Sequence, residues 1–306
     1  MHIINGREIA RKIRDELLQE IAEKGLAPKL GVLLVGDDPA SHLYVNLKEK
    51  AAAEIGIATD IRRLPAATSD DELKRIIKNW NRDAAVHGIL VQLPLPEEHD
   101  TNAIIQEIDP RKDADGFHPT NVAALLEGRG KIIPPLHEGI LRLIASTGMV
   151  MNGARATIVA NSDIFSKPLD RLLRTAGAYT AILSPDDLHL STLRDSQIII
   201  TAIGRPRVLT RDHIAPGAVV IDVGISTTAE KKIVGDVDAE SVKDLPGWLS
   251  PVPGGVGPMT IAMLLKNVFS IAKDITLPSL PRATSQFSSA ASREPQEGSP
   301  QSHSTS

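Results

Sequence analysis

The chain contains no cysteine, and only 3% of its 306 residues are aromatic. The missing cysteine excludes disulfide bonds, thiolate metal ligands and a cysteine nucleophile. Since 42% of the residues are nevertheless hydrophobic, a core is possible, but it must be built mainly from Ala, Val, Ile and Leu. No apolar run reaches the roughly 18 residues that a membrane-spanning helix needs, so we expect no membrane association.

The chain also has no excess of positive charge. The chain has 34 Lys and Arg against 38 Asp and Glu, a net charge of −4, which gives no basic surface of the kind that binds nucleic acid. The N-terminal segment carries charges every few residues and lacks the apolar centre of a secretion signal. We therefore expect a cytoplasmic enzyme, with about two domains at roughly 150 residues per domain.

Short apolar runs alternate with amphipathic segments along the chain, which predicts an α/β fold with parallel sheets. We expect strands at residues 29–36, 57–64, 87–96, 154–160, 178–183, 196–204 and 217–224, with a small strand or hairpin at 231–238. We expect helices at residues 8–24, 41–56, 69–81, 168–177 and 259–275.

A region rich in glycine and proline near residues 128–138 predicts a domain boundary. We expect residues 1–135 to form an N-terminal α/β domain, completed by a returning C-terminal helix at 259–276. Residues 136–258 are expected to form a Rossmann-like domain with a parallel sheet. Residues 277–306 are rich in Ser, Pro and Gln, which predicts a disordered tail.

Four polar residues of the first half are candidates for chemistry. Tyr44 and Lys48 share a helix face, where a tuned lysine could move protons, although a solvated lysine would have the same spacing. Gln92 ends an apolar strand, where ligands of α/β sheets collect, or it bonds a neighbouring loop. Asp115 could accept hydrogen bonds from the amidine-like edge of a heterocycle, or it could form a turn.

The segment 251–260 contains three prolines and three glycines before an apolar helix. Glycine allows the backbone to approach a ligand closely, and the helix start could bind an acceptor or an anion. Asp222, Asp236 and Asp238 precede this segment, but their spacing matches no strong metal motif. We expect caps or turn contacts from these carboxylates, and no metal.

Seven segments, taken in order, resemble the bifunctional methylenetetrahydrofolate dehydrogenase/cyclohydrolase (FolD) family. The resemblance extends from about residue 3 to residue 275. Its segments are SHLYVNLKEK (41–50), GILVQLPLP (88–96), RKDADGFHPTN (111–121), AIGRP (202–206), PGAVVIDVGI (216–225), VGDVD (234–238) and SPVPGGVGPMTIAMLL (250–265).

The resemblance implies two α/β domains with a cleft between them and an enzyme of one-carbon folate metabolism, which serves purine biosynthesis. A hydride would pass from 5,10-methylenetetrahydrofolate to a nicotinamide. Water would then convert the resulting 5,10-methenyltetrahydrofolate into 10-formyltetrahydrofolate. The resemblance also implies a homodimer whose ligands are tetrahydrofolate derivatives and NAD(P).

The same resemblance implies residue roles. Lys48 would be the acid/base group, Tyr44 would stack on the folate rings, and Gln92 would support Lys48. Asp115 would hold the edge of the pterin. The loop 251–258 would line the folate channel, with Pro253, Gly254, Gly255 and Pro258 as substrate-binding residues.

The dinucleotide-binding half departs from the family. The implied cofactor-binding residues are Ala160, Asn161, Ser162, Ser184, Asp186, Ile203, Gly204 and Ile225. The family's loop Gly-Arg-Ser-x-x-Val-Gly-x-Pro is Ala-Asn-Ser-Asp-Ile-Phe-Ser-Lys-Pro at residues 160–168. Ala160 and Ser166 would add side chains where glycines let the backbone approach a pyrophosphate. The missing arginine removes a cationic partner for a 2′-phosphate.

NADP is the cofactor that the resemblance implies, but NAD is possible because this arginine is absent. Asp186 stands where the family commonly has a His-Ser-Arg-Thr-like segment, and a carboxylate there suits a ribose 2′-hydroxyl. Lys167 or Arg171 could replace the lost charge. The domain junction also departs from the family, at residues 121–125 and 134–137.

Three alternatives to the bifunctional enzyme remain open. A divergent paralogue would keep mainly cyclohydrolase activity or use NAD. A folate-binding or partner subunit would not catalyse at all, and loss of Lys48 would leave its role intact. An unrelated Rossmann dehydrogenase would ignore folates.

Overall fold

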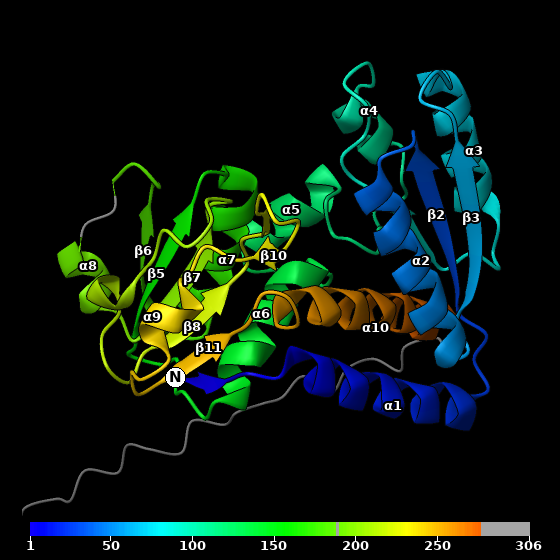
Figure 1. Ribbon diagram of the computed structural model, residues 1–306. Coiled ribbons are helices and arrows are strands. Elements are labelled where there is room, and N and C mark those ends of the chain that lie inside the picture. Colours follow the sequence, from blue (N-terminus) through cyan, green and yellow to red (C-terminus); the bar gives the residue numbers. More distant parts are fainter. Residues whose placement is uncertain (188–189, 277–306) are drawn as a thin grey trace, which may run out of the picture.

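The computed structural model describes residues 1–187 and 190–276, whose main strands form two separate sheets (Figure 1). The smaller sheet contains, in order, β3 (Ala58–Leu64), β2 (Lys29–Val35) and β4 (Gly88–Val91). The larger contains β1 (His2–Ile3), β11 (Trp248–Ser250), β8 (Val219–Asp222), β7 (Ile198–Ala202), β5 (Arg155–Ala160) and β6 (Tyr179–Leu183). All pairs in both sheets are parallel, which confirms the predicted α/β class.

The smaller sheet lies in a lobe whose helices begin at side-chain caps. The helices are α1 (Gly6–Lys24), α2 (Pro39–Glu54), α3 (Asp70–Arg82) and α4 (Thr101–Gln106). Asn5, Asp38 and Ser69 each accept a hydrogen bond from a backbone N–H in the first turn that follows them. Such caps satisfy donors that have no partner within the helix, so they fix where each helix starts.

The larger sheet lies in the second lobe with the remaining short elements. These are α7 (Asp163–Thr175), α8 (Leu190–Arg194), α9 (Ala239–Val242) and a 3₁₀ turn at Arg211–His213. β9 (Ser226–Thr227) and β10 (Ile233–Val234) pair in antiparallel fashion. The small strand predicted at 231–238 is confirmed as β10, and its partner lies before that range. The segment between the two lobes contains α5 (Pro119–Leu126) and α6 (Pro135–Ser146).

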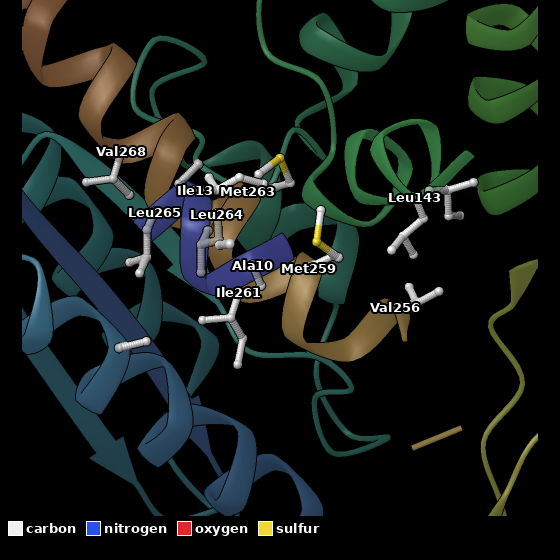
Figure 2. Packing of buried hydrophobic residues seen from close by; sticks show 14 of the residues in the cluster. Ala10, Ile13, Leu143, Val256, Met259, Ile261, Met263, Leu264, Leu265 and Val268 are labelled. Atoms are coloured by element: carbon white, nitrogen blue, oxygen red, sulfur yellow. The ribbon is translucent and has the colours of Figure 1, made fainter. Parts of the chain in front are cut away.

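The last helix, α10 (Val256–Thr276), returns to the first lobe. It packs against α1, α2, β2, β4 and also α6, and Figure 1 shows it running between the lobes above α1. Figure 2 shows its apolar side chains, including Met259 and Leu264, beside Ala10 and Ile13 of α1. All four residues are buried in one core cluster. The predicted return of the C-terminal helix is confirmed.

Several predictions of where elements begin, end or pair were wrong. α7 begins at Asp163 rather than at Pro168, so this proline lies inside the helix and removes one backbone donor there. α10 begins at Val256, which puts Pro258 in its first turn, where a backbone N–H has no helical partner. The strand expected at 87–96 is only β4, because Pro94 and Pro96 follow closely. β1, expected in the first domain, pairs with β11.

Two further expectations concern the tail and membrane-spanning helices. The predicted tail, 277–306, lies outside the described residues. Within residues 1–187 and 190–276, no helix has both the length and the apolar character of a membrane span.

Gly6 at the start of α1 lies directly against the loop that precedes α10. A Cβ atom at Gly6 would collide with the carbonyl oxygen of Gly255. We therefore expect Gly6→Ala to lower the free energy of unfolding by about 1–3 kcal/mol, a typical cost of overpacking. Denaturant titration would measure it. Gly257→Ala is the control, because no atom lies within 4 Å of the added Cβ; equal stability losses in both variants would contradict this prediction.

Candidate active site

A cavity of about 760 Å³ lies between the two lobes. The first lobe contributes side chains of α1 and α2 and the end of β4, and the second lobe contributes residues that follow β8. The loop 251–255 and the first turns of α10 close it. Of the predicted site residues, the cavity is lined by Tyr44, Lys48, Gln92, Pro253, Gly254, Gly255, Pro258 and Ile225.

The centre of this site is a hydrogen bond between two buried side chains. Lys48 Nζ donates to Gln92 Oε1 at 2.8 Å, and each side chain is only 9% exposed. Gln92 Nε2 donates to the carbonyl oxygen of Leu93 at 2.7 Å. Because the amide nitrogen is engaged by the following residue, the amide oxygen faces the lysine. Gln92 therefore orients Lys48 and is also anchored in its own loop.

Burial shifts the pKa values of Lys48 and of the nearby Asp115. Burial lowers the pKa of Lys48, while the negative charge of Asp115 opposes that shift. Burial likewise raises the pKa of Asp115 from its usual 3.8 to about 6. The positive charge of Lys48 opposes this rise, and the negative charge of Asp113 adds to it. Asp115 does not line the cavity itself. Its charge nevertheless acts on Lys48, which does line the cavity. Lys48 therefore loses its proton more easily than a surface lysine.

Asp113 and Asp115 are close in sequence but differ in what they bind. The carboxylate of Asp113 accepts hydrogen bonds from the N–H groups of Gly116 and His118 and from Asn121 Nδ2. In the part of the chain that the structure describes, no donor reaches the carboxylate of Asp115 within hydrogen-bond distance. Asp113 thus forms the turn, and the carboxylate of Asp115 takes no part in it.

The predicted cofactor-binding residues collect at one edge of the larger sheet. β8, β7, β5 and β6 are neighbours, and their carboxyl ends carry Ile225, Ile203 and Gly204, Ala160 to Ser162, and Ser184 and Asp186 in turn. Asn161 Nδ2 donates to the carbonyl oxygen of Ile203 at 3.2 Å, which joins two of these loops. No atom lies within 4 Å of a Cβ built at Gly204, so a ligand has room against this backbone. These residues fit a dinucleotide.

The two glycine replacements change this edge less than expected. Ala160 is 8% and Ser166 2% exposed, so both side chains are buried within the protein. The charge differs more. Asp163 lies in the first turn of α7 and pairs with Lys167 at 2.7 Å. The guanidinium of Arg171 packs against Gly128, and its buried Nε has no hydrogen-bond partner among the described residues. Of the two candidate replacement cations, only Lys167 is therefore already paired.

Asp186 forms an ion pair that could not be predicted from the sequence. Arg205 Nη2 lies 2.8 Å from Asp186 Oδ1, with both side chains mostly exposed. Asp186 follows β6 and Arg205 follows β7, two strands separated by β5. No spacing rule links residues on different strands, so only the folded sheet brings these charges together.

Asp222 and Asp236 hold turns of the second lobe, on its side of the cavity. Asp222 accepts backbone hydrogen bonds from Gly224, Asp236 and Val237. Asp236 accepts from Thr201 Oγ1 and from the N–H groups of residues 203–205. Burial and the neighbouring Asp236 raise the pKa of Asp222 to about 7, against its backbone hydrogen bonds. The predicted turn contacts are confirmed for these two residues, and Asp238 precedes α9.

Several lining residues were not identified from the sequence. They are Arg7, Arg14, Leu47, Lys50, Glu54, Leu136, Val223, Ile233 and Thr260, among others. Arg7 and Arg14 carried a weak signal, because residues seven apart lie on one face of a helix. In residues 1–187 and 190–276, no group of three His, Asp or Glu side chains could hold a metal ion.

The raised pKa of Asp115 predicts a pH-dependent stability. The folded state holds this proton more tightly than the unfolded state, so ionisation of Asp115 costs stability as the pH rises from about 4 past 6. Asp115→Asn removes that cost. Its stability relative to the parent chain should rise by about 2–3 kcal/mol between pH 4 and pH 8.

Unfolding titrations at several pH values would measure this difference. Asp109→Asn is the control, because Arg111 lowers the pKa of Asp109. Its stability relative to the parent chain should stay nearly constant between pH 4 and pH 8 and change only at lower pH. If the curves for Asp115→Asn and the parent chain run parallel, the carboxyl of Asp115 is not perturbed.

Two family models match this chain. The tetrahydrofolate dehydrogenase/cyclohydrolase catalytic domain matches residues 4–115, and the NAD(P)-binding domain of the same proteins matches residues 134–276. The bifunctional protein FolD of Moorella thermoacetica is 44% identical over 275 residues, which cover 89% of this chain and 98% of that protein.

Solved structures agree with these matches. The bifunctional FolD dehydrogenase/cyclohydrolase of Campylobacter jejuni is 40% identical, with a TM-score of 0.86 over 90% of this chain and 99% of that one. The FolD dehydrogenase-cyclohydrolase of Trypanosoma brucei, complexed with NADP and an inhibitor, is 34% identical, with a TM-score of 0.83 over 89% of this chain and 97% of that one.

Proposed function

Because the chain belongs to the tetrahydrofolate dehydrogenase/cyclohydrolase family, we propose that both reactions of that family take place in the cavity between its lobes. The enzyme oxidises 5,10-methylenetetrahydrofolate to 5,10-methenyltetrahydrofolate with NAD(P) and hydrolyses that product to 10-formyltetrahydrofolate. The observation that carries the single-site proposal is the buried hydrogen bond between Lys48 and Gln92 in the cavity wall.

Substrate binding uses acceptors and apolar surface. Asp115 accepts hydrogen bonds from the amino and ring N–H groups at the edge of the pterin. This role is supported because no donor from residues 1–187 or 190–276 reaches its carboxylate. Tyr44 provides the stacking surface on α2, one helical turn before Lys48. Pro253 and the neighbouring glycines hold the other side of the channel. The one-carbon bridge is then near the Lys48 amine.

In the dehydrogenase step this chain contributes an environment that tolerates a cationic product. When bound, the nicotinamide accepts the hydride, and the bridge becomes the methenyl cation. A protonated lysine beside it would raise the energy of this product through like-charge repulsion. Burial favours the neutral amine of Lys48, so the repulsion is reduced.

In the cyclohydrolase step Lys48 handles protons. The neutral amine takes a proton from water as the water oxygen bonds to the methenyl carbon. The bond from that carbon to N5 then breaks, N5 receives the proton from Lys48, and the hydroxyl proton leaves to solvent as the formyl group forms. Gln92 Oε1 accepts one N–H of the amine, which leaves the lone pair free to be directed into the cavity.

We further propose that NAD is used in preference to NADP. The carboxylate of Asp186 can accept hydrogen bonds from ribose hydroxyls but repels a 2′-phosphate. Arg205 is already paired with it, and Lys167 is paired with Asp163 at the start of α7. These three observations favour the cofactor that lacks the phosphate.

We also propose that the enzyme is a cytoplasmic homodimer that supplies one-carbon units for purine biosynthesis. The apolar side chains of β6 support an association of two chains, since Tyr179 and Ile182 of this edge strand are 71% and 44% exposed. Sedimentation of the purified chain would test the dimer.

Lys48→Met tests the acid/base role. We expect cyclohydrolase turnover to fall by roughly 10²- to 10⁴-fold, the usual contribution of a positioned acid/base group, while folate binding persists. The decay of methenyltetrahydrofolate absorbance measures turnover, and calorimetry measures binding. Lys12→Met on α1 is the control, because Lys12 is exposed and pairs with Glu8. Unchanged turnover in Lys48→Met would refute the role, and a purely binding protein would show no turnover to lose.

Asp186→Ser tests the cofactor preference. Removing this carboxylate frees Arg205 and ends the repulsion of a 2′-phosphate, so the ratio of kcat/KM for NADP over NAD should rise about tenfold, which corresponds to 1.4 kcal/mol. Asp187→Ser, one residue further along the same exposed loop, should leave the ratio near its starting value. Equal changes in the two variants would mean that loop charge in general, and not Asp186, affects the cofactor.

A further inference from the structure

A buried histidine joins α6 to the first turn of α7 and has no part in the chemistry above. His137 is 2% exposed, and its Nε2 donates to the carbonyl oxygen of Phe165 at 2.8 Å. The two rings also lie close together, with centroids 5.3 Å apart and planes inclined by 31°. His137 follows Leu136 of the cavity wall, and Phe165 belongs to the altered loop 160–168. The contact therefore connects the segment between the lobes to the dinucleotide edge.

The protonation state of His137 follows from its surroundings. Burial lowers the pKa of His137 to about 4, against the hydrogen bond to Phe165, so the ring is neutral and carries one N–H. Because a carbonyl oxygen only accepts, this N–H is on Nε2. Nδ1 is buried and has no hydrogen-bond partner within residues 1–187 and 190–276. An unsatisfied buried acceptor lowers stability, and an apolar side chain would avoid that loss. Filling the core therefore does not by itself account for a histidine here.

The first turn of α7 lacks the anchor that starts the long helices of the first lobe. Each of α1, α2 and α3 begins at a side-chain cap, whereas the side chain of Ser162 makes no capping hydrogen bond to α7. Pro168 also removes one backbone donor within α7. The position of this turn therefore depends on contacts from other elements, and His137 provides one of them.

α6 is itself held against α10. The carboxylate of Glu138 pairs with Lys266 of α10, and a Cβ added at Gly139 would lie 3.0 Å from the Cβ of Met259. Both contacts come directly after His137 in α6. The histidine N–H is therefore fixed relative to the helix that closes the folate cavity, so it sets where the first turn of α7 lies relative to that cavity.

Both partners of this contact stand where the sequence departs from the family pattern. Phe165 occupies the position of a valine in the family's loop, and His137 belongs to the altered junction segment 134–137. The structure brings these two departures into one contact. The altered loop is thus paired with an altered anchor.

We propose that His137 is a positioning residue for the dinucleotide, because its hydrogen bond to Phe165 fixes the first turn of α7 against the folate cavity. The inference rests on the proposed function, since it concerns the cofactor of that reaction. The pyrophosphate of a dinucleotide lies at the start of such a helix, where a displaced turn makes poorer hydrogen bonds. The cyclohydrolase step needs no dinucleotide, so it should not depend on this contact.

The variants His137→Phe and His137→Gln separate the hydrogen bond from the ring. Phenylalanine keeps a ring against Phe165 but has no donor, so the KM of the dinucleotide in the dehydrogenase step should rise about 2- to 12-fold, the range for one lost hydrogen bond. Glutamine can place an N–H near the position of Nε2, so the dinucleotide KM of His137→Gln should stay closer to that of the parent chain. In both variants, kcat and KM of the cyclohydrolase step should be unchanged.

Ile144→Val is the matched control. Ile144 lies seven residues after His137 on the same face of α6 and is fully buried, so this variant loosens the same helix without removing a hydrogen bond. Its dinucleotide KM should equal that of the parent chain. Equal KM increases in Ile144→Val and His137→Phe, or a parallel loss of cyclohydrolase activity in His137→Phe, would overturn the positioning role. His137→Leu also lacks a donor and replaces His137→Phe if a thermal melt shows that the latter has not folded.

A binding experiment separates this inference from the proposed activity. NAD and NADP are titrated by calorimetry, without folate, into the parent chain, His137→Phe and His137→Gln. Weaker binding to His137→Phe than to the other two proteins supports the positioning role even if no folate is turned over, in which case only the proposed function fails. Equal affinities of the three proteins, or no binding of either dinucleotide to the parent chain, would refute the inference whatever the activity.

Discussion

The buried amine of Lys48 is the constraint around which the cavity is organised. A lysine that is 9% exposed has lost most of its hydration, and a charge in such a place is costly unless it is paired. The structure supplies one good acceptor, Gln92, and one carboxyl group, Asp115, whose own ionisation is opposed by burial. Burial therefore shifts both Lys48 and Asp115 towards their neutral forms. A lysine shifted in this direction is better suited to take and return a proton.

The returning helix α10 forms part of the wall of the cavity that Lys48 lines. The helix returns to the first lobe and packs its apolar face on α1, α2 and the smaller sheet. Its Asn267 donates to the carbonyl oxygens of Ala114 and Ile133, so the loop that carries Asp115 is tied to the same helix. The contact of Gly6 with Gly255 joins α1 to the loop before α10. The core and the site are thus held by the same contacts.

Much of this arrangement could be predicted from the sequence, because parallel strands buried on both faces read as apolar runs. Gln92 was recognisable for the same reason, as a polar residue at the end of such a run. The start of α7 was missed because Pro168 looks like a first-turn proline, although the helix tolerates it five residues later. Arg205 could not be assigned at all. Its partner Asp186 follows a different strand, and no local spacing records such a contact.

The two halves of the site tolerate sequence change differently, and the structure gives a physical reason. The proposed folate site depends on particular side-chain atoms of α2 and of the segment after β4, such as the hydrogen bond between Lys48 and Gln92. The dinucleotide edge depends more on backbone shape. There Ala160 and Ser166 replace glycines, yet both side chains are buried inside the protein, so the backbone keeps its course. A change of charge at this edge does alter nucleotide binding, because a carboxylate near the ribose acts over several ångströms. The consequence of the altered loop should therefore be a change in which nucleotide binds, with the fold and the folate chemistry left in place.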